Sequence, residues 1–170
     1  IHHLFKRGHK RVAHISEMSL HESSIRERYD AYIDAMNEIG VSDTSELLRL
    51  IKPTTDTDYL SQVVHDAMFT ILHQPDPPTA VFCVHERYLA ALMEASIKLK
   101  ISIPEQLEVL SFSDLPTWML RSPQSVNRIS QRLETIGRIA AERLRKRIEG
   151  EEMAPETIRV PADFHPALQK

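Results

Sequence analysis

The sequence has few of the residues that mark disulfide-rich, phosphate-binding or membrane proteins. Its single cysteine, Cys83, has no partner for an intrachain disulfide, so a reducing compartment is expected. Only four glycines occur, and none belongs to a glycine-rich phosphate loop that follows a strand. No apolar run approaches the ~20 residues that a membrane-spanning helix needs. We therefore expect a cytoplasmic protein with no membrane partner.

Signatures of enzymes and metal sites are also missing. The sequence has no Gly-x-Ser-x-Gly elbow, no Cys-x-x-Cys pair and no helical histidine pair beside a carboxylate base. The nine histidines are interpreted as structural or surface residues. These absences predict no catalytic residues, no metal and no cofactor, and hence a protein that is not an enzyme.

Charge and hydrophobicity are balanced. The 21 Lys and Arg against 24 Asp and Glu give a formal charge of −3, which does not favour direct binding to nucleic acid or a membrane surface. The hydrophobic fraction of 42% and the charged fraction of 26% are ordinary for a globular protein. A chain of 170 residues can form one domain with its own core, or part of a larger protein.

Short apolar runs alternate with segments of helical periodicity along most of the chain. Strands are predicted at residues 11–15, 47–51, 80–84, 107–112 and 125–130, with an extended piece at 157–160. Helices are predicted at 24–39, 60–72, 88–99 and 133–148, after the last turns of a helix that ends at Gly8. Ser24 and Glu27 have the spacing of a capping box. The alternation predicts an α/β fold with a doubly wound parallel sheet.

Polar residues follow the predicted strands. The buried run at 80–84 leads into His85, Glu86 and Arg87, and other strand exits contribute Glu17 and residues 54–59 and 113–118. Parallel strands end at one edge, where open α/β folds bind ligands. His85 has two interpretations at this stage, as a ligand contact or as a cap of the following helix.

Four motifs in order give the sequence a family resemblance. They are Arg-Gly-His-Lys-Arg-Val-Ala at 7–13, Arg-Tyr-Asp-Ala-Tyr at 28–32, Pro-Thr-Ala-Val-Phe at 78–82 and the run Ile-Pro-Glu to Phe-Ser-Asp at 103–114. The chain resembles the carboxyl-terminal effector-binding domain of the lac-repressor (LacI/GalR) family of bacterial transcription regulators. That domain is similar to the periplasmic sugar-binding proteins, so the resemblance implies a periplasmic-binding-protein-like fold.

The resemblance also implies a ligand site, formed by Arg28, Tyr59, His85 and Ser113. His85 and Glu86 stand where the family has Asn-Asp, and Ser113 replaces an aspartate that hydrogen-bonds the effector. Losing that charged acceptor disfavours a typical sugar. Gln131 matches a glutamine near a crossover between subdomains.

The implied organisation is that of a regulator. Residues 1–131 correspond to the carboxyl-terminal effector-binding subdomain, 132–150 to a helix of a largely missing amino-terminal subdomain, and 151–170 to a terminal strand and tail. The expected partners are a small effector (a sugar, nucleoside or related polar metabolite) and operator DNA, bound through a helix-turn-helix outside this chain. A homodimer is also expected, through residues 88–99 and the Trp118-Met119-Leu120 loop, although Trp118 could instead cover this chain's own core.

Two other functions fit the same sequence. A stand-alone solute-binding protein has the same core but needs an export signal. A small α/β enzyme could use His85 and Glu86 as an acid–base pair.

Overall fold

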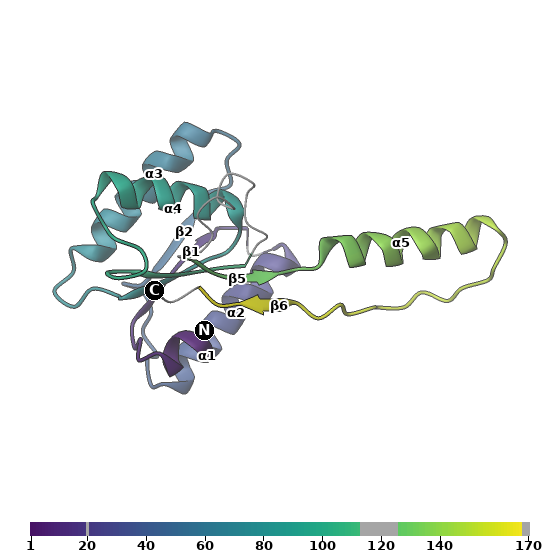
Figure 1. The fold of residues 1–170 in the computed structure, drawn as a ribbon, viewed down its shortest axis with the longest axis horizontal. Helices are drawn as coiled ribbons and strands as arrows, with labels where there is room; N and C mark the ends of the chain where they lie inside the picture. Colours follow the sequence, from purple (N-terminus) through teal and green to yellow (C-terminus); the bar gives the residue numbers. More distant parts are fainter. Residues whose placement is uncertain (20, 113–125, 168–170) are drawn as a thin grey trace.

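The computed structural model describes residues 1–19, 21–112 and 126–167. Helices and strands alternate within this part, as Figure 1 shows. The elements are α1 (His2–Lys6), β1 (Val12–Glu17), α2 (Ser23–Glu38), β2 (Leu48–Ile51), α3 (Thr57–Leu72), β3 (Ala80–Cys83), α4 (Glu86–Lys98), β4 (Glu108–Ser111), β5 (Val126–Ser130), α5 (Leu133–Ile148) and β6 (Asp163–His165).

The strands form one six-stranded sheet in the order β2-β1-β3-β4-β5-β6. Neighbours from β2 to β5 pair in parallel, and only the β5–β6 pair is antiparallel. The predicted α/β class and parallel core are therefore confirmed. The carboxyl ends of β1 to β5 lie along one edge of the sheet, where the sequence places its polar residues.

Helices cover both faces of the sheet (Figure 1). On one face, Leu4 of α1 and Tyr32 and Met36 of α2 pack on Val12, Phe82 and Leu110. On the other face, α3 and α4 pack on a second set of strand residues, which includes Ile15, Val81, Cys83 and Val109. Every residue of β3 is buried, which explains why its sequence is continuously apolar rather than alternating.

The helix boundaries confirm some local predictions and correct one. Gly8, two residues after the end of α1, adopts φ +95°, a conformation that glycine allows at little cost. The predicted capping box was wrong: α2 begins at Ser23 after Glu22, so Ser24 lies inside its first turn and no side chain caps the helix. A side chain does cap α3: Asp56 accepts from the backbone N–H of Asp58 and of Tyr59, both at 3.0 Å.

The last helix, α5, projects away from the sheet, and the chain returns beside it to form β6 (Figure 1). No residue of α5 is buried. Residues 157–160 run next to α5, away from the sheet, so the predicted extended piece has no strand to pair with; pairing begins only at Asp163. Arg132 and Asp163 form a bidentate ion pair of 2.6 and 2.5 Å where both segments leave the sheet.

His14 illustrates a structural histidine, as the sequence suggested for most of the nine. It is fully buried on β1, stacked on Phe82 at 4.7 Å and close to Tyr32 at 4.8 Å. Burial lowers its pKa to about 4, although the bond to the Phe82 carbonyl opposes this shift. The ring is therefore neutral in the folded protein at pH 7.

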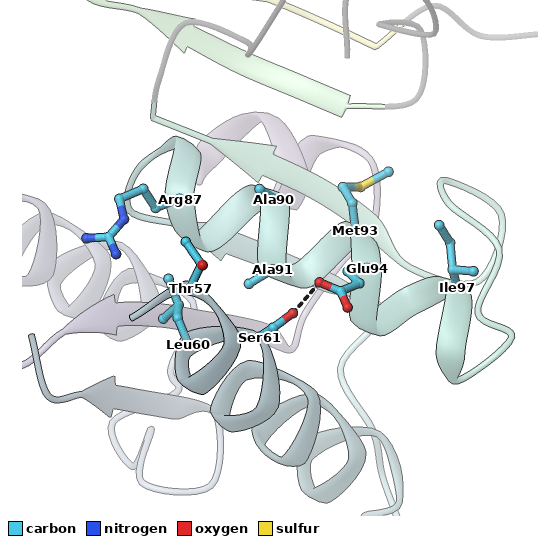
Figure 2. A pocket seen from close by; sticks show the side chains of 9 residues that line it. All are labelled: Thr57, Leu60, Ser61, Arg87, Ala90, Ala91, Met93, Glu94 and Ile97. Carbon is cyan, nitrogen blue, oxygen red and sulfur yellow. Dashed lines mark hydrogen bonds between the residues drawn. The ribbon is translucent and has the colours of Figure 1, made fainter. Parts of the chain in front are cut away.

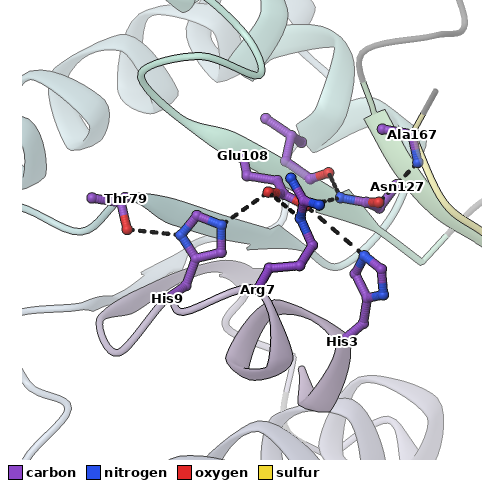
Figure 3. Close-up of polar contacts among 8 residues, drawn as sticks. His3, Arg7, His9, Thr79, Glu108, Asn127 and Ala167 are labelled. Carbon is purple, nitrogen blue, oxygen red and sulfur yellow. Dashed lines mark hydrogen bonds and ion pairs between the residues drawn. The ribbon is translucent and has the colours of Figure 1, made fainter. Parts of the chain in front are cut away.

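The amino-terminal edge of the sheet carries a buried carboxylate that joins distant segments (Figure 3). Glu108 of β4 is 4% exposed and accepts from Arg7 Nε at 2.8 Å, His9 Nε2 at 2.9 Å and Asn127 Nδ2 at 2.8 Å. The Asn127 Oδ1 atom in turn accepts from the backbone N–H of Ala167 at 2.9 Å. Burial raises the pKa of Glu108, but the three side-chain donors outweigh burial, and the net pKa lies below its usual value.

This network predicts a pH-dependent contribution to stability. Glu108→Gln removes the charge that pairs with Arg7 and weakens the hydrogen bond from His9, so we expect a loss of about 2 kcal/mol at pH 7 in urea unfolding. Because the folded-state pKa of Glu108 is depressed, its contribution is present above the unfolded-state pKa of about 4.3 and disappears as pH falls through the folded-state value.

The matched control is Glu46→Gln, because Glu46 pairs with Arg11 at 3.4 Å but its side chain is 72% exposed. It should change stability by less than about 0.5 kcal/mol. An equal loss from Glu108→Gln at pH 7 and at pH 3 contradicts the electrostatic explanation.

Candidate functional site

The candidate site lies at the carboxyl edge of the sheet, where β1, β3, β4 and β5 end. The backbone N–H of Val84 donates to the Ile15 carbonyl at 3.2 Å, so pairing between β1 and β3 continues past Cys83. This bond fixes the position of the next residue, His85, relative to the end of β1 at Glu17.

Arg28 reaches this edge from the second turn of α2. Its Nη1 donates to the Val84 carbonyl at 3.1 Å, and its Nη2 donates to Gln131 Oε1 at 3.4 Å. The guanidinium carbon lies 4.1 Å from the centre of the Phe112 ring, in a cation–π contact. Burial lowers the pKa of Arg28, while Glu86 and Glu27 oppose the shift.

A groove of about 380 Å³ opens beside Arg28. Its apolar floor comes from three strands or their exits, and its polar residues come from α2 and the end of β5. The floor includes Phe82, Leu110, Phe112 and Ile129, and the polar residues are Ser24, Glu27, Arg28 and Gln131. An apolar surface with a few convergent polar groups is typical of a small-molecule site.

His85 occupies the N-cap position of α4 but does not cap the helix with its side chain. Its Nε2 lies 3.6 Å from Glu17 Oε2, and its ring meets Tyr88 edge to face at 4.8 Å. Glu17 Oε1 accepts from Ser19 Oγ at 2.7 Å. Burial lowers the pKa of His85, and Glu86 and Glu17 partly offset that effect.

The predicted site residues are therefore only partly assembled in the described part of the chain. Arg28 and His85 lie together, because Arg28 bonds to the residue before His85. Tyr59 lies in the first turn of α3, 50% exposed, on the helix layer opposite α2. Its side chain makes no hydrogen bond or ring contact with Arg28 or His85. Ser113 and the Trp118-Met119-Leu120 loop lie outside the described residues.

Two features of the site were not predicted from the sequence. Phe112 supports the Arg28 guanidinium, and the only signal for it was an aromatic residue at the end of a predicted strand. Glu17 was assigned to the edge, but its pairing with His85 depends on the register of β1 and β3.

A protein-family model identifies the family to which the chain belongs. The model of the "periplasmic binding protein-like domain" matches residues 1–166. This chain belongs to that family. This match confirms the periplasmic-binding-protein-like fold that the resemblance to lac-repressor-type regulators implies.

The relatives of this periplasmic binding protein-like domain are transcription regulators, not enzymes. It is 24% identical over 168 residues to the repressor PurR of Glaesserella parasuis, covering 98% of this chain and 47% of PurR. It is 26% identical over 155 residues to the repressor CytR of Escherichia coli K12, covering 89% of this chain and 42% of CytR.

Among solved structures, the transcription regulator CcpA of Lactococcus lactis has the same fold. The TM-score is 0.77 at 17% identity, and the match covers 98% of this chain and 58% of that one. The chain thus spans about half the length of the curated relatives it matches. Within the described residues, no helix is both long enough and apolar enough to cross a bilayer.

Proposed function

We propose that this domain is the effector-sensing and dimerising part of a cytoplasmic bacterial transcriptional repressor. The supporting observation is the convergence of Arg28, His85 and Gln131 at the carboxyl edge of the sheet, beside an apolar groove. The effector is a small polar molecule such as a sugar, a nucleoside or a related metabolite. Operator DNA is bound by a helix-turn-helix outside this chain, as the names of the relatives suggest.

In this proposal the chain contributes to two subdomains, which meet where β5 leads into α5. Residues 1–131 form the effector-binding subdomain, α5 within residues 132–150 packs on a second subdomain, and residues 151–170 return to the sheet. The support is the exposed apolar side of α5, to which Leu133, Ile136, Leu144 and Ile148 contribute. Gln131 bonds to Arg28 directly before the α5 segment. A ligand that engages Arg28 therefore acts at this junction, and shifts DNA affinity by its differential affinity for the two subdomain arrangements.

The proposed dimer forms through the groove between α3 and α4 (Figure 2). This groove of about 400 Å³ has small and apolar residues at its centre, including Ala90, Ala91 and Met93. Arg87 and Glu94 also line it, about two turns apart on α4. If a two-fold axis relates two copies across this groove, Arg87 of each copy can lie near Glu94 of the other. The surface is then self-complementary.

The dimer proposal predicts the effect of a charge in the groove. Ile97 lines it and is 77% exposed, so Ile97→Asp should leave the fold intact and convert the dimer to a monomer in size-exclusion chromatography with light scattering. Ile148→Asp on α5 is the control, because Ile148 is also 77% exposed. A dimer that survives Ile97→Asp but dissociates with Ile148→Asp places the interface elsewhere.

The ligand proposal predicts a specific role for Arg28. The natural gene product is titrated with adenine, adenosine and ribose by calorimetry. For the compound that binds, Arg28→Ala should raise the Kd about ten- to a hundredfold, because a charged hydrogen bond contributes about 1.5–3 kcal/mol. Arg26→Ala is the control, because Arg26 is exposed on the same helix and pairs with Asp30 at 2.9 Å. Undiminished affinity of Arg28→Ala removes Arg28 from the site.

The sequence of the gene upstream of this domain distinguishes a regulator from an exported solute-binding protein. We expect the codons upstream of Ile1 to encode a helix-turn-helix. An export signal followed directly by this domain contradicts the regulator proposal.

A further inference from the structure

A carboxylate and an imidazole from different strands meet beside Arg28. Glu17 ends β1 and His85 follows β3, and the two side chains are mostly shielded, with 16% and 20% of their surfaces exposed. The Glu17 Oε2 atom lies 3.6 Å from His85 Nε2. Neither residue contributes to the apolar groove, so the pair has a position of its own at the edge of the site.

The surroundings hold both side chains in a defined orientation. Ser19 Oγ donates to Glu17 Oε1 at 2.7 Å and thereby fixes the carboxylate. The Tyr88 ring, edge to face with His85, limits rotation of the imidazole. His85 Nε2 is therefore directed to Glu17.

The other ring nitrogen, Nδ1, has no hydrogen-bond partner among the described residues. Among the described residues, the fully buried side-chain polar atoms without a partner are Arg11 Nε, His14 Nε2 and Ser16 Oγ. His85 Nδ1 is absent from that set and makes no hydrogen bond to any described residue. Because 20% of the His85 side chain is exposed, we take Nδ1 as the atom that a ligand at the carboxyl edge meets.

We propose that Glu17 is a positioning residue of the effector site, which holds the His85 imidazole so that Nδ1 accepts a hydrogen bond from the ligand. This inference rests on the proposed function and deepens it, because it specifies what the ligand presents. Arg28 only donates, and neutral His85 with its proton on Nε2 accepts through Nδ1. The ligand therefore brings an acceptor oxygen or nitrogen to Arg28 and an N–H or O–H donor to His85. A sulfate ion, which offers only acceptors at neutral pH, does not fit this pair.

Burial favours the neutral form of His85. It lowers the pKa of the ring more than Glu86 and Glu17 raise it, and the nearby Arg28 guanidinium adds a smaller lowering effect. Protonation of Nδ1 converts the acceptor into a donor and adds a positive charge beside Arg28. Ligand binding should consequently weaken as the pH falls through the pKa of His85.

The first experiment needs no ligand. The protein with ¹⁵N-labelled histidine side chains is titrated by NMR, and the His85 signals are assigned by their loss in His85→Asn. Glu17→Gln preserves the size of the side chain and removes its charge, so the His85 titration midpoint should fall below that of the wild type. Glu38→Gln, which removes the exposed partner of His2, should leave the midpoint unchanged. An identical midpoint in wild type and Glu17→Gln overturns the inference.

The second experiment links the pair to binding. The Kd of adenine, adenosine and ribose is measured by calorimetry between pH 5 and pH 8, and the compound that binds should bind less tightly at the acidic end. In Glu17→Gln this weakening should move to lower pH, in step with the NMR midpoint. A pH-independent Kd in the wild type refutes the acceptor role of His85. Failure of all three compounds to bind counts against the proposed function, whereas the NMR titration still decides the Glu17–His85 coupling.

Discussion

The parallel pairing of β1 with β3 is the constraint on which the candidate site depends. Its register aligns Val12 with Ala80 and Ile15 with Cys83, and the Val84–Ile15 backbone bond extends it to the end of both strands. A slip of one residue reverses the side-chain orientation along a strand. In the observed register, one helix layer packs on Val12, Ala80 and Phe82 and the other on Ala13, Ile15, Val81 and Cys83, so a slip would exchange two sets of packed side chains. Glu17, Val84 and His85 owe their proximity to this pairing, and Arg28 finds its carbonyl acceptor there.

The two edges of the sheet differ in how completely their polar groups are paired. At the amino-terminal edge, Glu108 is surrounded by Arg7, His9 and Asn127, and the network ties the beginning of the chain to its end. Such a satisfied network stabilises one arrangement. At the carboxyl edge, Arg28 and His85 keep donor and acceptor capacity beyond their internal contacts. This contrast is expected when one edge maintains the fold and the other binds a ligand.

The sequence predicts the helices and strands well where hydrophobic periodicity is strong. It predicts less well the features that depend on how strands pair or on where a helix begins. The apolar run of β3 and the helical face of α4 are visible in the residues alone, because burial dictates them. The capping box at Ser24 and Glu27 failed because the N-cap of α2 is Glu22, two residues earlier. The extended piece at 157–160 does not join the sheet, since strand pairing begins only at Asp163. Arg28 and His85 could be predicted for the site through the family motifs. The Glu17–His85 pair could not, since it requires the register of two strands 60 or more residues apart in sequence.

Hydrogen–deuterium exchange of the natural gene product tests ligand binding at the carboxyl edge most directly. With saturating adenine, adenosine or ribose, whichever binds, we expect slower exchange in residues 82–88 and 128–133, and unchanged exchange in residues 7–12 at the opposite edge. Protection confined to the Glu108 edge or to α3 and α4, with residues 82–88 unaffected, contradicts the proposed site.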